Sequence, residues 1–173
     1  MRRLIAAIAL LTFVMLAPSG CRRRKKVSAR EDGLASVVNV AEPADSAQLL
    51  SGFSNVEADA WRWTTSKFAV VLRPPAGAAQ KGANLTMQFT LHESVVNKLG
   101  PVTVSATAGG QTIAPETFSK PGDYLYSHEV PASALGADVV TVYFSTDKSL
   151  APTDQDRREL ALIVKSIGLV AKP

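Results

Sequence analysis

Four residues with potential for ligand binding lie close together in the chain: Glu57, Trp61, Arg62 and Trp63. Trp61 and Trp63 are two positions apart, so on an extended strand their rings point to the same face. An exposed aromatic face can stack against the apolar side of a sugar ring, and Glu57 and Arg62 could hydrogen-bond its hydroxyls. The alternative is that the indoles fill a protein core. We favour this alternative for Trp63, and for Trp61 we give core packing and sugar stacking about equal weight.

A second charged group, made of Asp156, Arg158 and Glu159, lies near the other end of the chain. Glu57 and Arg62 could pair with Asp156 and Arg158 instead of with a ligand. Such a network would tie the first strand of a closed sandwich to its last strand. We slightly favour this structural interpretation over the binding of sugar hydroxyls.

The sequence offers little material for catalysis or for metal chemistry. His92 and His128 are each followed by a glutamate that faces the opposite side of a strand, so neither forms a dyad. Two histidines and one cysteine are few for a zinc or iron-sulfur centre, and we expect no metal and no cofactor. Paired carboxylates of a glycosidase, Glu57 with Asp154 or Asp156, remain a distant alternative. We therefore expect a protein that is not an enzyme.

The charge of the chain argues against nucleic acid as a partner. Seven of the 19 basic residues lie within the first 26 positions, so the high isoelectric point is a property of the N-terminus. The rest of the chain has 12 basic residues and all 15 acidic ones. Its net charge of −3 would not attract phosphates.

The N-terminus has the three parts of an export signal: basic residues at 2–3, a nearly all-apolar run from Leu4 to Ala17, and small residues before Cys21. The run is short for a membrane span. Residues 1–20 resemble the signal peptide of a bacterial lipoprotein, which implies lipidation of Cys21 and anchoring of an exported protein to a membrane of the cell envelope. The alternative is an uncleaved anchor, because the five basic residues Arg22–Lys26 would resist translocation.

Residues 21–46 are predicted to form the lipidated cysteine, a basic stretch and a tether. This segment is polar and contains several turn residues, apart from the apolar patch from Leu34 to Val40. Val37, Val38 and Val40 could therefore pair as an edge strand of the domain that follows, which we place at residues 47–173.

The residue pattern of the domain predicts an all-β fold. Short β-rich runs alternate with turn residues. Leu85–Leu91 is apolar at every second position, which is typical of a sheet with one face exposed to solvent. Gly109-Gly110 predicts a hairpin turn, and Ser133–Leu135 one helical turn. We expect an antiparallel two-sheet sandwich with strands at Phe68–Leu72, Leu85–Leu91, Val102–Ala108, Tyr124–Val130, Val139–Ser145 and Leu160–Val170.

Motifs at both ends of the domain carry a family resemblance. They are Gly52-Phe53 with Glu57 and Arg62-Trp63-Thr64, then Pro152, Asp156, Arg158-Glu159-Leu160 and Ser166–Leu169. Between Ser51 and Leu169 the chain resembles jelly-roll domains found beside bacterial glycosyltransferases and in other envelope proteins. The resemblance implies a sandwich of the carbohydrate-binding-module type and does not fix a ligand.

Three functions from different classes follow as hypotheses. The first is a lipid-anchored, non-catalytic module that binds envelope glycans or polysaccharide. The second is a structural or assembly lipoprotein that contacts other envelope proteins through its sheet. The third, a glycoside hydrolase, is the least favoured.

Overall fold

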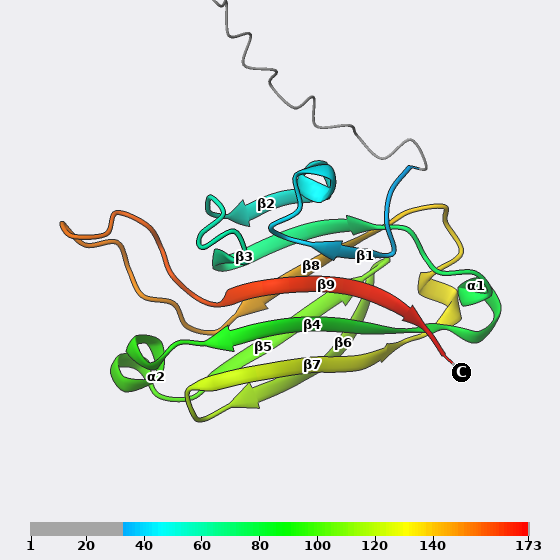
Figure 1. Ribbon diagram of the computed structural model, residues 1–173. Coiled ribbons are helices and arrows are strands. Elements are labelled where there is room, and N and C mark those ends of the chain that lie inside the picture. Colours follow the sequence, from blue (N-terminus) through cyan, green and yellow to red (C-terminus); the bar gives the residue numbers. More distant parts are fainter. Residues whose placement is uncertain (1–32, 173) are drawn as a thin grey trace, which may run out of the picture.

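The computed structural model describes residues 33–172 (Figure 1). Cys21 and the apolar N-terminal run lie outside these residues. Within them the chain forms nine strands and a few short helices. In chain order the elements are β1 (Val37–Asn39), η1 (Pro43–Gln48), β2 (Leu49–Phe53), β3 (Arg62–Leu72), α1 (Ala78–Lys81), β4 (Ala83–Leu91), α2 (Glu93–Leu99), β5 (Val102–Ala108), β6 (Gln111–Phe118), β7 (Gly122–Val130), η2 (Ala132–Ala134), β8 (Val140–Thr146) and β9 (Ile163–Ala171).

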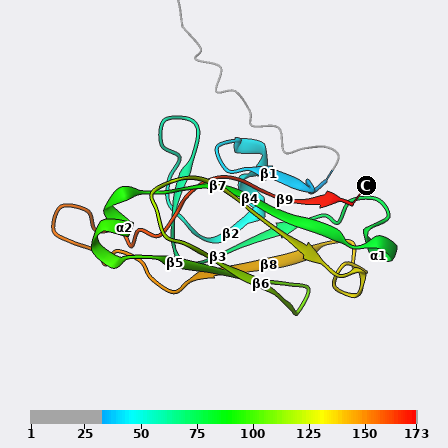
Figure 2. The same ribbon diagram turned by 90° about the horizontal axis from the view of Figure 1, so that it is seen from below.

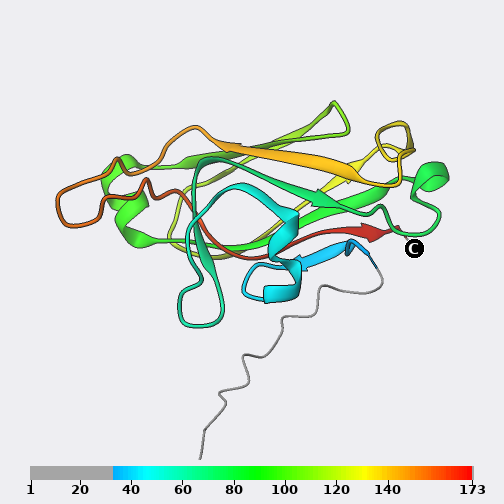
Figure 3. The same ribbon diagram turned by 90° about the horizontal axis from the view of Figure 1, so that it is seen from above.

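The strands form two antiparallel layers around one core. Sheet A consists of β1, β9, β4 and β7, and sheet B of β2, β3, β8, β5 and β6. Figure 3 shows the layers from the edge, with orange β8 in one and red β9 in the other, and Figure 2 shows them from the opposite side. Strand β3 belongs to both sheets, since its start pairs with β9 and the rest of it pairs with β8. The predicted two-sheet sandwich is confirmed.

Alternation of side chains builds the core. Strand β4 buries every second residue from Ala83 to Leu91 and leaves the residues between them partly or fully accessible. Strand β8 likewise buries Val140, Val142 and Phe144 and turns Tyr143 outward. Rings from both sheets meet inside, where Phe89 of β4 packs edge to face on Phe118 of β6 at 5.0 Å between centroids. Burial of these apolar side chains is the main stabilising contribution.

The segment after β4 differs from the prediction. His92 does not continue a strand but caps helix α2, where its Nδ1 accepts a hydrogen bond from the Ser94 amide at 3.2 Å. The helix ends at Gly100, whose φ of 75° suits glycine. Strand β6, which was not in the predicted set, completes a hairpin with β5 across the expected Gly109-Gly110 turn.

The packed domain begins before residue 47, where the sequence prediction placed its start. Strand β1 pairs with β9 from Val37 to Asn39, and Val38 is fully buried. The buried side chain of Gln48 accepts a hydrogen bond from the Ala35 amide and donates to the carbonyls of Ala35 and Val71. These contacts explain why the apolar patch in the predicted tether is part of the sheet.

No helix within residues 33–172 is long and apolar enough to cross a membrane.

Candidate functional site

The two groups of charged residues singled out in the sequence meet at one end of the sandwich. The loop between β2 and β3 makes a tight turn in which the backbones of Glu57 and Trp61 pair, and Ala58 and Asp59 adopt positive φ angles of 49° and 51°. The turn presents Glu57 to the long loop between β8 and β9. That loop is itself a hairpin, closed by backbone hydrogen bonds between Leu150 and Leu160.

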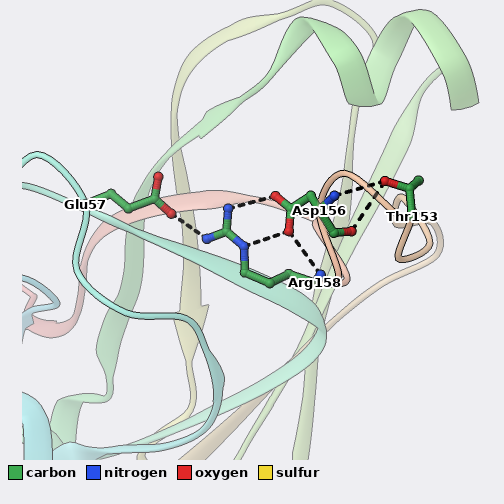
Figure 4. A network of polar contacts seen from close by, with 4 residues as sticks. All are labelled: Glu57, Thr153, Asp156 and Arg158. Atoms are coloured by element: carbon green, nitrogen blue, oxygen red, sulfur yellow. Dashed lines mark hydrogen bonds and ion pairs between the residues drawn. The ribbon is translucent and has the colours of Figure 1, made fainter.

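Arg158 joins the two loops (Figure 4). Its Nη1 donates to Glu57 Oε1 at 2.5 Å, while Nε and Nη2 form a two-pronged contact with the Asp156 carboxylate at 2.9 and 2.8 Å. The hydrogen bonds from Arg158 lower the pKa of Asp156 to about 2. Because one guanidinium engages both carboxylates, the cluster links the β2–β3 loop to the β8–β9 loop.

Glu159 and Arg62 belong to separate sets of contacts. Glu159 accepts hydrogen bonds from the Ser149 hydroxyl at 2.6 Å and the Ser66 amide at 3.0 Å, and these bonds lower its pKa. Arg62 donates to the backbone carbonyls of Val40 and Ser54 at 2.7 and 2.8 Å. The structure therefore brings Glu57, Asp156 and Arg158 together and keeps Arg62 out of that network.

The two tryptophans lie on one face of the chain, against each other. Their rings meet edge to face at 6.4 Å, and Trp63 also contacts the His92 ring at 5.7 Å. Trp63 is 7% exposed and belongs to the core, while Trp61 is partly buried and packs against that core. The favoured interpretation of Trp63 as a core residue is therefore confirmed, and the alternative of a stacking surface for Trp63 is wrong because this side chain is buried.

The pKa of Asp156 and the contacts of this cluster argue against the glycosidase alternative. A general acid of a glycosidase needs a raised pKa, whereas that of Asp156 is lowered. Asp156 and Glu57 are also bound by the same guanidinium. Among the described residues no group of histidine, cysteine or carboxylate side chains is arranged to hold a metal ion.

A different feature, the outer face of sheet B, is hollowed. A depression of about 260 Å³ runs over β2, β3, β8, β5 and β6. Most of its lining surface is apolar, and Phe68 and Phe144 lie beneath it, but the outward side chains around it carry several hydroxyl groups, one aromatic ring and one amine. These side chains are Ser51, Lys67, Ser105, Thr107, Thr112, Tyr143 and Ser145.

Strand register explains how these side chains come together. Tyr143 pairs with Ala69 on one side and with Thr107 on the other, and Thr107 pairs with Thr112. Paired residues share a face of the sheet, so Tyr143 stands in a row between small side chains. With 60% of its surface exposed, Tyr143 is the most exposed aromatic residue within residues 33–172.

Tyr143 also borders a second depression. This hollow, of about 550 Å³, lies over the start of β8, the Gly109-Gly110 turn and the segment around η2, with Ser133 and Thr141 in its lining. Tyr143 lines both hollows, so the two are neighbours on sheet B. We call the two hollows together, from Ser51 and Lys67 past Tyr143 to Gly110 and Ala137, the sheet B groove.

Glycine at position 52 lets β2 form one wall of the sheet B groove. Gly52 has a φ of 77°, and a Cβ atom there would lie 2.2 Å from the Lys67 carbonyl oxygen and 2.7 Å from Phe68 Cα. Only glycine fits so close an approach. The glycine of the predicted Gly52-Phe53 motif thus sets the distance between Ser51 and Lys67.

The sequence prediction missed the sheet B groove. The signal was present in β8, where Val140, Val142 and Phe144 alternate with Thr141 and Tyr143. An aromatic ring on the polar side of an alternating strand indicates a functional surface more directly than two tryptophans next to a turn, because a sandwich core recruits aromatic rings on its inner side.

Comparisons with known proteins find similarity of overall structure only. No protein-family model and no curated protein matches the chain. Among solved structures, the CBM36-1 domain of a multidomain xylanase from the hindgut metagenome of Trinervitermes trinervoides is similar with a TM-score of 0.43 and 11% identity over 79% of this chain and 97% of that one. TmCBM27, a carbohydrate-binding module described for specific mannan recognition, gives 0.47 and 12% over 82% and 98%.

A third solved structure is the 4-O-methyl-alpha-glucuronidase BtGH115A, with a TM-score of 0.47 and 7% identity. The similarity covers 82% of this chain and 18% of that larger one. With identities and TM-scores this low, what the chain binds has to be derived from its own residues.

Proposed function

We propose that this domain binds a polysaccharide strand in the sheet B groove without cleaving it. The observation that carries the proposal is the exposed Tyr143 ring, which lines both hollows. An exposed tyrosine offers an apolar ring face with a polar tip, which suits stacking against a sugar. A groove made of two neighbouring hollows suits a polymer better than a compact small molecule.

Hydroxyl groups along the groove supply the polar contacts that a sugar needs. No side-chain hydrogen bond joins the hydroxyls of Ser51, Ser105, Thr107 or Ser145 to another residue within the described part of the chain. Each hydroxyl can donate one hydrogen bond and accept others. They are therefore available to a ligand, unlike Thr103 and Thr117 outside the groove, whose hydroxyls bond to each other at 2.9 Å.

Binding without catalysis is supported by the same lining. The residues that line the two hollows include no carboxylate and no histidine. Hydrolysis of a glycosidic bond at this surface would need two carboxyl groups on either side of it. The groove offers shape, a stacking surface, hydroxyl groups and one ammonium group, but no carboxyl pair.

Binding of Tyr143→Ala to a panel of soluble polysaccharides tests the proposal. We expect affinity electrophoresis and calorimetry to show about tenfold or greater weakening, because loss of the ring face costs on the order of 1.5 kcal/mol. The matched control is Leu125→Ala, which removes a side chain of similar exposure (56%) on the other sheet. The full chain should be handled in a detergent without a sugar headgroup. Equal binding by parent and Tyr143→Ala would refute the groove as the site.

Export and lipid anchoring through Cys21 complete the proposal. They are supported by the order of basic, apolar and small residues before that cysteine. Replacing Cys21 with serine should move the protein from the membrane fraction to the soluble fraction. Unchanged retention in membranes would instead favour an uncleaved anchor.

A further inference from the structure

We infer that the ligand of the sheet B groove is an acidic polysaccharide and that Lys67 binds its anionic group. The inference rests on the proposed function, since it names the class of glycan that the same groove would accept.

The charge of the groove carries the inference. Among the residues that line the two hollows, Lys67 is the only one with a charged side chain. It is exposed, and it makes no ion pair within 4.0 Å with any carboxylate of residues 33–172. By contrast, Lys165 of β9 pairs with Asp123, and Lys172, directly after β9, pairs with Glu129. Within residues 33–172 the ammonium of Lys67 therefore has no carboxylate partner.

The position of Lys67 relative to Tyr143 suits contact with a stacked sugar. Lys67 pairs with Ser145, which lies two residues along β8 from Tyr143. With two residues of rise along one strand and one step between strands, the two Cα atoms lie roughly 8 Å apart. The long lysine stem can bridge this separation. A carboxylate carried by the sugar on Tyr143, or by its neighbour in the strand, would thus come within reach of the ammonium.

The size of the effect follows from exposure. Ion pairs between exposed groups contribute about 0.2–1 kcal/mol, which is roughly 1.4- to 5-fold in Kd. Salt screens such pairs. We therefore expect Lys67 to set a preference between acidic and neutral glycans, while Tyr143 supplies most of the affinity.

The test compares polymers that differ only in charge. Polygalacturonate, alginate and glucuronoxylan are each titrated beside the carboxyl-reduced form of the same polymer, with the full chain in a detergent without a sugar headgroup. Lys67→Gln removes the charge and keeps a polar side chain that is one carbon shorter. Lys120→Gln is the matched control, because Lys120 is also exposed and lies outside both hollows.

We expect the parent to bind at least one acidic polymer about two- to fivefold more tightly than its reduced form. This preference should disappear in Lys67→Gln and at high salt, and persist in Lys120→Gln. Equal binding of acidic and reduced forms by the parent, with binding still lost in Tyr143→Ala, would overturn the inference and leave the proposed function standing. An equal loss of preference in both lysine variants would overturn it too, since net charge would then explain the preference. If no polymer of any kind binds, the proposed function itself fails.

Discussion

Replacing Gly52 with alanine should destabilise the fold and deform the sheet B groove. The φ of 77° is costly for a residue with a Cβ atom, by roughly 1–2 kcal/mol. The new methyl group would also lie 2.2 Å from the Lys67 carbonyl oxygen, on backbone that has little room to move. Overpacking of this kind adds about 1–3 kcal/mol. We therefore expect a loss of about 2–5 kcal/mol in the free energy of unfolding.

Gly100→Ala separates the two contributions. Gly100 has nearly the same φ, 75°, but a Cβ atom there would have no neighbour within 4 Å. It should cost only the roughly 1–2 kcal/mol of the backbone conformation. Both variants also restrict the unfolded chain to the same degree, so that effect cancels in the comparison.

Urea unfolding followed by tryptophan fluorescence, with linear extrapolation to water, measures both variants. The difference between them reports the clash at β2. If Gly52→Ala is destabilised no more than Gly100→Ala, then β2 does not lie against Lys67 as described, and the wall of the groove is misplaced. At denaturant concentrations where both variants are folded, Gly52→Ala should also bind polysaccharide more weakly than Gly100→Ala.

Two further predictions concern the loop end of the sandwich. Contact with Arg158 lowers the pKa of Asp156 from 3.8 to about 2, so the stabilising contribution of this carboxylate is present above pH 4 and is lost as the pH falls toward 2. In Asp156→Asn the free energy of unfolding should therefore fall less over this interval than in the parent. An identical acid profile of the two proteins would contradict the contact. Trp63→Ala should lower the free energy of unfolding by about 3–5 kcal/mol because Trp63 is 7% exposed, and Trp61→Ala should lower it clearly less. Thermal unfolding of the two variants checks this order. Equal losses would mean that Trp61 is as deeply packed as Trp63.

The sequence was sufficient for the fold class because period-two alternation is a local property. Each residue of Leu85–Leu91 could be assigned to a face from its neighbours alone, and the structure has the same assignment. Strand β6 was missed for the same reason. Its burial pattern is irregular, with Ile113 and Phe118 as its buried residues and Pro115 between them, and its place is fixed by pairing with β5.

The candidate site was harder to predict because it depends on register between strands distant in sequence. Lys67, Ser105 and Ser145 form one row only because β3, β8 and β5 pair with a particular alignment. No local pattern encodes that alignment. The link between Glu57 and Arg158 spans the whole domain as well, and here motifs at the two ends of the chain indicated the proximity.

The hydrogen bonds at Ala35 have a mechanical consequence. The Ala35 amide donates to Gln48 Oε1, and its carbonyl accepts from Gln48 Nε2 and from the Arg73 amide. Gln48 is bonded in turn to Val71 of β3. Tension applied to the chain ahead of residue 33 would therefore reach β3 directly, before the short β1 ladder carried load. Since β3 also bears Lys67, a protein held at one end by its N-terminus and at the other by a ligand would transmit force through a single strand shared by both sheets.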